Sequence, residues 1–252
     1  MTGKLFTDHI RRTLIGMTLG AMAVVALAAL PDAAAAQATG SPLKIGIIGA
    51  GREGGALGTL FVKAGHPVMF SSRHPEELKG LVAGIGPLAR AGTVEEAITF
   101  GDVVAIVVPY AAMEQIGKAY ADALAKKVLV LDVSNPIARR DGEDLIKWVG
   151  EQGGAGLATA KFLSGAHIVR GFNAIGSGRL AAVAHRAGDP VGVPIAGDDP
   201  KAIAVAENLI REIGFEPVLV GGLAMGKYLV PGTPLGGEHT PAEIRQIAGT
   251  LH

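Results

Sequence analysis

The sequence contains no cysteine among its 252 residues. This absence excludes disulfide bonds, thiolate catalysis and cysteine-based zinc sites, although it does not identify a compartment. Aromatic residues are scarce, at 4% of the chain, and 23 basic residues balance 23 acidic ones. Because a nucleic-acid-binding protein normally carries a basic face, we expect no nucleic-acid partner.

Glycine and aliphatic residues are abundant instead, with 37 glycines and 49% hydrophobic residues. Frequent turns between aliphatic strands favour an α/β protein over a β-sandwich or a helical bundle. The length suits one large domain or one domain with an appendage.

Residues 1–38 differ in kind from the rest. A basic start precedes an uncharged stretch over residues 14–30, and Ala36-Gln37-Ala38 places small residues at −3 and −1 of a cleavage site. This order is typical of a secretory signal peptide. We therefore expect an exported, periplasmic protein that meets the membrane only during export, with a single domain over residues 39–252.

Two alternatives concern this leader. Arg11-Arg12 resembles a twin-arginine signal, so both the twin-arginine and the general export route stay open. An uncleaved anchor is the other alternative, but the uncharged stretch is short and rich in alanine and glycine for a stable membrane span.

Beyond the leader, short apolar runs alternate with helical patterns. We predict strands at 43–48, 67–71, 102–108, 127–133, 167–172, 191–196 and 216–220. We predict helices at 56–64, 76–82, 94–100, 111–124 and 200–213, a loop or hinge at 150–157, and a short helix beginning at Thr240. Strands without alternation, each followed by a helix, indicate a parallel sheet covered on both faces. The predicted fold is therefore α/β with a doubly wound, mostly parallel sheet of the Rossmann dinucleotide-binding type.

The glycine pattern Gly49-Ala50-Gly51-Arg52-Glu53-Gly54 follows the first predicted strand and opens a helix. This is the context that a dinucleotide phosphate site requires, because free N–H groups at the helix N-terminus bind the anion. Gly49 would form the tight turn, Gly51 would let the backbone approach the pyrophosphate, and Gly54 would allow close packing. The alternative is a structural turn in a glycine-rich chain.

We expect different roles for the two charged residues inside this loop. Arg52 can add a charge-assisted contact to a phosphate. Glu53 is unexpected beside an anion, and we expect its carboxylate to point to solvent, where it suits the helix dipole.

The second predicted strand ends in Ser71-Ser72-Arg73 and carries no carboxylate there. An NAD site has an acidic residue at this position, whereas Ser72 and Arg73 can donate hydrogen bonds to the 2′-phosphate of NADP. The sequence therefore favours NADP(H) over NAD(H). The alternative is that Arg73 is a solvated loop residue.

With these residues in place, the chain resembles the coenzyme F420-dependent NADP oxidoreductases. It is also similar to the NADP-binding module of pyrroline-5-carboxylate reductases and STEAP-type ferric reductases. The resemblance covers roughly residues 43–230. Its further motifs are Val108-Pro109-Tyr110, Asp132-Val133-Ser134-Asn135-Pro136 and Gly171-Phe172-Asn173-Ala174-Ile175.

The resemblance implies roles for these motifs. Val108-Pro109-Tyr110 would contribute to the nicotinamide side of the cofactor site, and Asn173-Ala174 would lie close to the ring. Asn135 and Asn173 can hydrogen-bond the carboxamide or a substrate, with turn capping as the alternative. As a proton donor, Tyr110 is less favoured than as a packing residue.

Hydride transfer between two bound rings needs proximity and orientation more than acid–base groups. No catalytic residue and no metal site is assigned, since the seven histidines show no metal-ligand spacing. We expect an NADP(H)-dependent oxidoreductase that exchanges a hydride with a flavin, deazaflavin-like or other external small-molecule acceptor. The alternative is a non-enzymatic NADP(H)-binding module that acts with a partner redox protein. The oligomeric state stays open, with a homodimer among the options.

Replacing Arg73 with alanine should weaken NADP(H) binding far more than NAD(H) binding, because only NADP(H) carries the 2′-phosphate. Titration of the purified variant with both cofactors measures the difference. Equal losses for the two cofactors would contradict the assignment.

Overall fold

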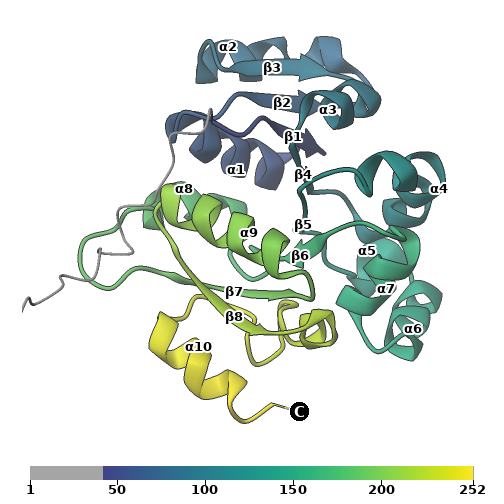
Figure 1. The fold of residues 1–252 in the computed structure, drawn as a ribbon, viewed down its shortest axis with the longest axis vertical. Coiled ribbons are helices and arrows are strands. Elements are labelled where there is room, and N and C mark those ends of the chain that lie inside the picture. Colours follow the sequence, from purple (N-terminus) through teal and green to yellow (C-terminus); the bar gives the residue numbers. More distant parts are fainter. Residues whose placement is uncertain (1–41, 252) are drawn as a thin grey trace, which may run out of the picture. The chain divides into compact units, whose positions relative to one another are not determined.

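The computed structural model describes residues 42–251, so the predicted signal peptide lies outside the described part of the chain. An eight-stranded sheet forms the centre of the molecule (Figure 1). Its strands are β1 (Ile45–Ile48), β2 (Val68–Ser71), β3 (Ala89–Gly92), β4 (Val103–Ile106), β5 (Leu129–Asp132), β6 (Ile168–Arg170), β7 (Gly192–Gly197) and β8 (Glu216–Gly221).

The strand order is β3-β2-β1-β4-β5-β6-β7-β8. Every pair from β3 to β6 is parallel, β6 and β7 pair antiparallel through Val169↔Gly197 and Arg170↔Ala196, and β7 pairs parallel with β8. The chain winds outward from β1 to β3 and then returns to β4 on the other side of β1. The predicted doubly wound, mostly parallel sheet is thereby confirmed, and its switch point lies between β1 and β4, where such folds bind ligands.

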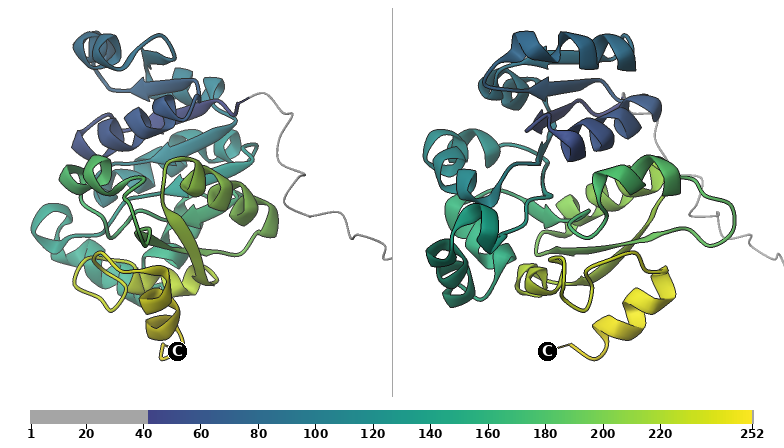
Figure 2. Two further views of the ribbon diagram at one scale, coloured as in Figure 1. Left: turned by 90° about the vertical axis from the view of Figure 1, so that its left-hand side faces the viewer. Right: turned by 180° about the vertical axis from the view of Figure 1, so that it is seen from behind.

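Helices cover both faces of this sheet (Figures 1 and 2). The α-helices of the described chain are α1 (Arg52–Lys63), α2 (Lys79–Ile85), α3 (Val94–Phe100), α4 (Met113–Leu124), α5 (Ala138–Asp141), α6 (Glu143–Glu151), α7 (Ala155–Phe162), α8 (Ser177–Val183), α9 (Pro200–Glu212) and α10 (Pro241–Ala248). Short 3-10 helices are η2 (Pro75–Leu78), η3 (Tyr110–Ala112) and η4 (Leu223–Tyr228).

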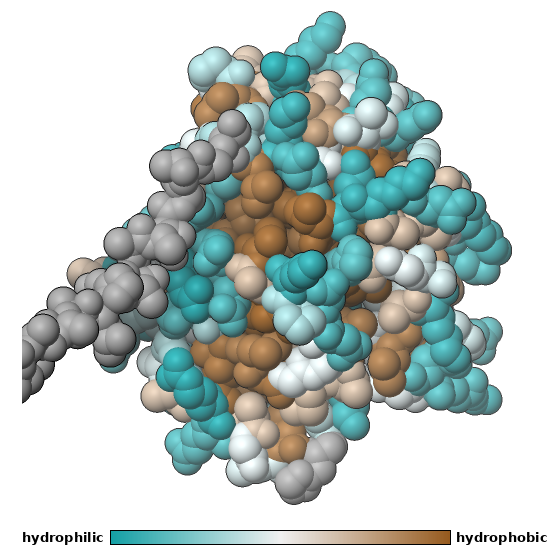
Figure 3. All heavy atoms as spheres, viewed as in Figure 1, coloured by the Kyte–Doolittle hydropathy of each residue, from teal (hydrophilic) through white to brown (hydrophobic). Residues whose placement is uncertain are grey.

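The helices form two apolar layers. Buried side chains of α1, α8 and α9 pack in one core cluster, and those of α3, α4, α6 and α7 pack in another. In the space-filling view, apolar residues gather toward the middle of the visible face and hydrophilic ones toward its edges (Figure 3). All residues of β1, β4 and β5 are buried because both faces are covered, which explains why these strands show no apolar–polar alternation.

The predicted loop or hinge at 150–157 is wrong. Helix α6 continues to Glu151 and α7 begins at Ala155, so only residues 152–154 connect them. A Cβ atom at Gly156 would lie 2.0 Å from the carbonyl oxygen of Leu223, so this glycine serves the close packing of α7 against η4. Strand β3 and helix α8 were not predicted either, since β3 is a partly exposed edge strand and α8 is short.

The C-terminal part packs on β7 and β8 through a third apolar cluster that includes Ile244 of α10. The short helix predicted to begin at Thr240 is confirmed, and Thr240 caps it by forming a reciprocal capping box with Glu243. Within residues 42–251, none of the helices combines the length and the apolar character that crossing a membrane requires.

Candidate functional site

The glycine loop joins β1 to α1 in a tight turn that requires two of its glycines. Gly49 has a φ of +99°, and a Cβ atom there would lie 2.3 Å from the carbonyl oxygen of Val107. A Cβ atom at Gly54 would lie 2.0 Å from the carbonyl oxygen of Gly49. Side chains at these two positions would push the turn apart, so the loop conformation depends on both glycines.

Gly51 is different, because its surroundings are open. A Cβ atom there would meet nothing within 4 Å, and Gly51 caps α1 without any side-chain hydrogen bond to the first turn. The exposed Arg52 follows it and makes no hydrogen bond or ion pair with any residue of the described chain. Space, unsatisfied N–H groups and a positive charge therefore meet at one helix N-terminus, which is the arrangement that fits a phosphate group.

A cavity of about 310 Å³ extends from this loop across the carboxyl ends of β4, β5 and β6. Eight of the predicted site residues line it: Gly51, Arg52, Glu53, Val108, Pro109, Asn135, Asn173 and Ala174. Other lining residues were not predicted, among them Ile137, Arg140, Phe172, Ile175 and Pro231. The structure thus brings together segments that lie more than a hundred residues apart in the sequence.

The remaining predicted residues lie outside this cavity. Gly49, Ala50 and Gly54 form the turn beside it, and Ser72 and Arg73 follow β2. Strand β2 neighbours β1 on the side opposite β4. A dinucleotide that crosses the switch point therefore has its two halves over different parts of the sheet, with Ser72 and Arg73 on the adenosine side.

Arg73, in the loop after β2, has no ionic partner among the described residues. The Ser72 hydroxyl accepts a hydrogen bond of 3.0 Å from the backbone N–H of His74. Arg73 is exposed, and no hydrogen bond or ion pair joins it to another described residue. Its guanidinium group is therefore available to an external anion.

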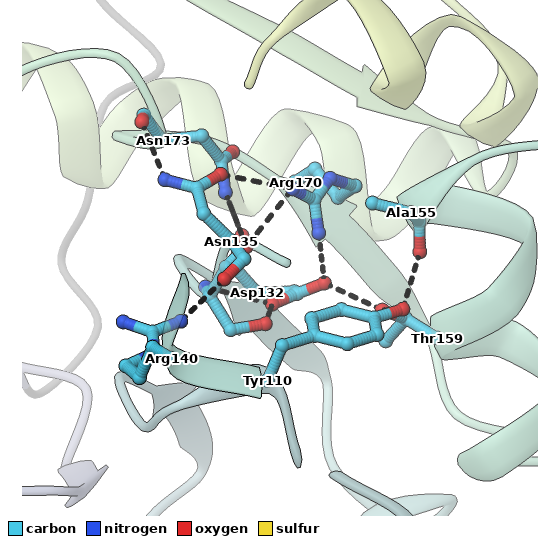
Figure 4. A network of polar contacts seen from close by, with 9 residues as sticks. Tyr110, Asp132, Asn135, Arg140, Ala155, Thr159, Arg170 and Asn173 are labelled. Atoms are coloured by element: carbon cyan, nitrogen blue, oxygen red, sulfur yellow. Dashed lines mark hydrogen bonds and ion pairs between the residues drawn. The ribbon is translucent and has the colours of Figure 1, made fainter. Parts of the chain in front are cut away.

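A polar network connects cavity-lining residues such as Ser134, Asn135 and Asn173 to buried residues behind them (Figure 4). At its centre, the guanidinium group of Arg170 donates to the carboxylate of Asp132, and both side chains are fully buried. The same carboxylate accepts hydrogen bonds from the backbone N–H and hydroxyl of Ser134 and from Thr159 on α7. Arg170 also donates to the carbonyl oxygen of Ser134 at 2.9 Å. One ion pair thus joins β5, β6, α7 and the loop after β5.

Tyr110 belongs to this network and does not line the cavity. Its side chain is fully buried, and its hydroxyl lies 3.0 Å from both the carbonyl oxygen of Ala155 and the hydroxyl of Thr159 (Figure 4). Burial, together with the nearby charge of Asp132, raises the pKa of Tyr110 above its usual value, so the phenol stays protonated. The structure places Tyr110 as a packing residue behind the cavity wall.

The two predicted asparagines tie the loops after β5 and β6 to each other. The Asn135 side chain donates to the carbonyl oxygen of Asn173 at 2.7 Å. The Asn173 side chain donates to the carbonyl oxygens of Ser134 at 3.1 Å and Asp132 at 3.3 Å, while its own amide oxygen is buried without a partner among the described residues. The amide groups therefore fix the shape of the cavity wall, and the Asn173 oxygen remains as an acceptor.

The prediction that the Glu53 carboxylate points to solvent is wrong. Glu53 lines the cavity, and its Oε1 atom is buried without a hydrogen-bond partner in the described chain. Burial raises its pKa to about 7, and a hydrogen bond from the backbone N–H of Ser177 only partly offsets this effect. The first turn of α1 packs close to α8, which the sequence analysis did not predict, so the carboxyl group is covered.

Arg140 is a further cation at the cavity, held in place by Asp141. The carboxylate of Asp141 accepts hydrogen bonds from Arg140 and from the backbone N–H groups of Ile137 and Ala111. Burial alone would raise the pKa of Asp141. The hydrogen bonds outweigh this effect and keep the pKa below its usual value. The pair Arg140-Asp141, close behind the Asn135-Pro136 motif, is the sequence signal that could have indicated this residue.

Comparison with known families agrees with this geometry. Residues 44–136 match the model of a family described as NADP oxidoreductase, coenzyme F420-dependent. The matched segment is less than half of the chain, but it contains the glycine loop, Ser72, Arg73 and Asn135. The resemblance inferred from the sequence is thereby confirmed over this segment.

Solved structures share the fold. A hypothetical protein, SMa0349, from Sinorhizobium meliloti is 27% identical with a TM-score of 0.67, over 79% of this chain and 95% of that one. An Arthrobacter sp. FB24 protein with a provisional assignment as an F420-dependent NADP-reductase is 18% identical, with a TM-score of 0.58 over 73% and 87% of the two chains. A reductive aminase from Aspergillus terreus, solved with NADPH, is 20% identical, with a TM-score of 0.52 over 83% and 61%.

A comparison with curated proteins found no match. The family match over residues 44–136 supports an NADP-dependent oxidoreductase in general, with NADP(H) as the cofactor, while the structural neighbours under 25% identity show the fold alone. The residues present fit that cofactor, because the open space at Gly51 and the free guanidinium group of Arg73 suit its phosphate groups.

Replacing Arg170 with methionine should lower the free energy of unfolding by about 3–5 kcal/mol, because it leaves the buried Asp132 carboxylate without its counter-charge. Chemical denaturation measures this loss. Arg179→Met is the matched control, since the Arg179–Glu238 ion pair is exposed, and it should change stability little. Similar small losses for both variants would contradict the central role of the buried pair.

Replacing Gly51 with valine should weaken NADPH binding at least about tenfold, because the new side chain occupies the space left for phosphate. The φ of Gly51 is −69°, so valine should leave the melting temperature nearly unchanged. Gly54→Ala is the contrasting variant and should lose stability as well as binding, since its Cβ atom meets the backbone. Unimpaired NADPH binding by Gly51→Val would show that the phosphates lie elsewhere.

Proposed function

We propose that this protein is an NADPH-dependent reductase that transfers a hydride to a flavin or deazaflavin-like acceptor. The observation that carries the proposal is the cavity at the carboxyl ends of β4, β5 and β6, which begins at the open phosphate site of Gly51. This cavity is where the nicotinamide half of NADPH would lie.

The cavity wall suits a planar ring. Val108, Pro109, Ile137, Phe172 and Ile175 give it a largely apolar lining, while a few polar groups lie among them. Apolar walls with few polar groups are typical of small-molecule sites, because the apolar area binds the ligand and the polar groups orient it. The lining therefore supports an aromatic acceptor held over the nicotinamide.

The cofactor supplies the chemistry when it is bound, because NADPH gives up a hydride and becomes NADP⁺. The acceptor gains that hydride, with its two electrons, and takes one proton from solvent. The chain itself binds both molecules, orients them and excludes water between them. In residues 42–251 no cluster of three or more histidine, aspartate or glutamate side chains is arranged to hold a metal ion.

Hydrogen bonds from side chains to backbone carbonyl oxygens support the proposal that the chain orients both molecules. Asn135, Asn173 and Arg170 fix the loops after β5 and β6 through hydrogen bonds of 2.7–3.1 Å to backbone carbonyl oxygens. A wall fixed in this way can hold two rings at a constant separation. Small errors in such a separation reduce the rate of transfer strongly.

The test is turnover with a panel of acceptors. The purified protein is mixed with NADPH and with FMN, FAD, a deazaflavin or a quinone dye, and the loss of the reduced nicotinamide absorbance is followed. We expect multiple turnovers with at least one flavin-like acceptor and much slower turnover with NADH. The Gly51→Val variant is the control, because it should lose turnover through loss of NADPH binding.

NADPH binding without turnover on any acceptor would contradict the enzymatic proposal. That result would favour a binding module whose acceptor is part of another redox protein. Binding and turnover are therefore measured on the same preparation.

A further inference from the structure

We propose that Glu53 sets the preference of this site between oxidised and reduced NADP, because this residue lines the nicotinamide half of the cavity and carries a buried carboxyl group there. The inference rests on the proposed function, since it assumes that NADP(H) binds in this cavity. It adds a residue to which neither the family match nor the fold assigns a role.

The sheet topology places Glu53 in that half. In a doubly wound sheet the cofactor crosses the switch point, so its two halves lie over opposite sides of β1. Ser72 and Arg73 mark the adenosine side, after β2. Glu53 instead shares the cavity wall with Asn173 and Ala174 after β6, and its carboxyl group meets the backbone N–H of Ser177 at the start of α8.

The carboxyl group is built into the wall and lacks a full set of partners. Its Oε1 atom is buried and has no hydrogen-bond partner among the described residues. An unpartnered buried oxygen is unfavourable in the free protein and becomes favourable once a ligand offers it a partner or a positive charge. Because Glu53 lines a ligand-sized cavity, the field of its covered carboxyl group acts on whatever binds there.

The other charged groups around Glu53 do not determine whether its carboxyl group is ionised. Arg52 lies next to it on α1, and Arg140 lines the cavity from α5, where it is paired with Asp141. Arg179 of α8 is paired with Glu238. The buried pair of Asp132 and Arg170, below the cavity, carries no net charge. Burial, rather than any of these charges, raises the pKa of Glu53 to about 7.

The two forms of the cofactor differ in charge only at the nicotinamide ring. This ring is positive in NADP⁺ and neutral in NADPH, whereas the pyrophosphate and the 2′-phosphate are the same in both. A carboxylate close to the ring attracts NADP⁺ and not NADPH. Once Glu53 ionises, the site should therefore shift its preference toward NADP⁺.

The sign of the pH dependence follows from the raised pKa. Below pH 7 Glu53 is mostly protonated and neutral, so it does not change the affinity of NADP⁺ relative to that of NADPH. As the pH rises through 7, the carboxylate forms and the ratio of the two dissociation constants, Kd(NADP⁺)/Kd(NADPH), should fall. Titration of the 2′-phosphate near pH 6 affects both forms equally and cancels in this ratio.

The experiment measures both dissociation constants at about pH 6 and about pH 8, on either side of the pKa of Glu53. Quenching of protein fluorescence reports NADPH binding, and calorimetry reports NADP⁺ binding. Three proteins are compared: the unmodified chain, Glu53→Gln, and Glu95→Gln. Glu95 is the matched control, because it is an exposed carboxylate in the first turn of α3 and does not line the cavity.

In the unmodified chain and in Glu95→Gln, we expect the ratio to fall about tenfold between the two pH values. In Glu53→Gln it should stay constant, and the variant should unfold at the same temperature as the unmodified chain. The glutamine side chain keeps the shape of the wall, so a difference reports the charge.

Two results would overturn the inference. A ratio that does not change with pH in the unmodified chain, while both affinities fall together, would place the carboxylate against the pyrophosphate. The same fall of the ratio in Glu53→Gln would assign the effect to another group. If the unmodified chain binds neither form at either pH, the proposed function fails, and the inference fails with it.

Discussion

The buried ion pair between Asp132 and Arg170 is the contact on which the candidate site depends. Removing two charged groups from water costs several kcal/mol each, and their mutual attraction offsets that cost only when the geometry is good and further hydrogen bonds support the pair. Here the carboxylate receives hydrogen bonds from Thr159 and Ser134 in addition to Arg170. These contacts, with the hydrogen bond from Arg170 to the carbonyl oxygen of Ser134, hold the ends of β5 and β6 together, although the Arg170 Nε atom is buried without a partner among the described residues.

This constraint explains the contrast between the two sides of the site. The proposed nicotinamide side consists of loops tied to the ion pair and to each other through Asn135 and Asn173. The wall formed by α1 holds Glu53, whose carboxyl group is only partly satisfied. A cavity wall held by hydrogen bonds, with one unsatisfied ionisable group in it, is the arrangement expected where a ligand completes the set of contacts.

The fold and the phosphate loop could be predicted from the sequence, because apolar runs and glycine spacing are local signals. The side chains around the loop could not. The orientation of Glu53 depends on α8, a short helix more than a hundred residues later in the sequence, and local reasoning favoured solvent for a carboxylate at a helix N-terminus. Arg170 has no local signal at all, since it occupies a strand position that would suit an aliphatic residue. Tyr110 was grouped with its cavity-lining neighbours Val108 and Pro109, yet its backbone turns into η3 and directs the ring into the core.

The loop that follows β2 is independent of all these constraints. Ser72 and Arg73 lie outside the cavity, and Arg73 contacts no other described residue through a hydrogen bond or an ion pair. Substitutions there leave the buried network and the glycine turn intact. If Ser72 and Arg73 select NADP(H), as the sequence predicts, substitutions at a few surface positions would exchange one nicotinamide cofactor for the other without disturbing the core. Cofactor choice would then be an evolvable trait of the scaffold, while the shape of the cavity wall is inherited with the core.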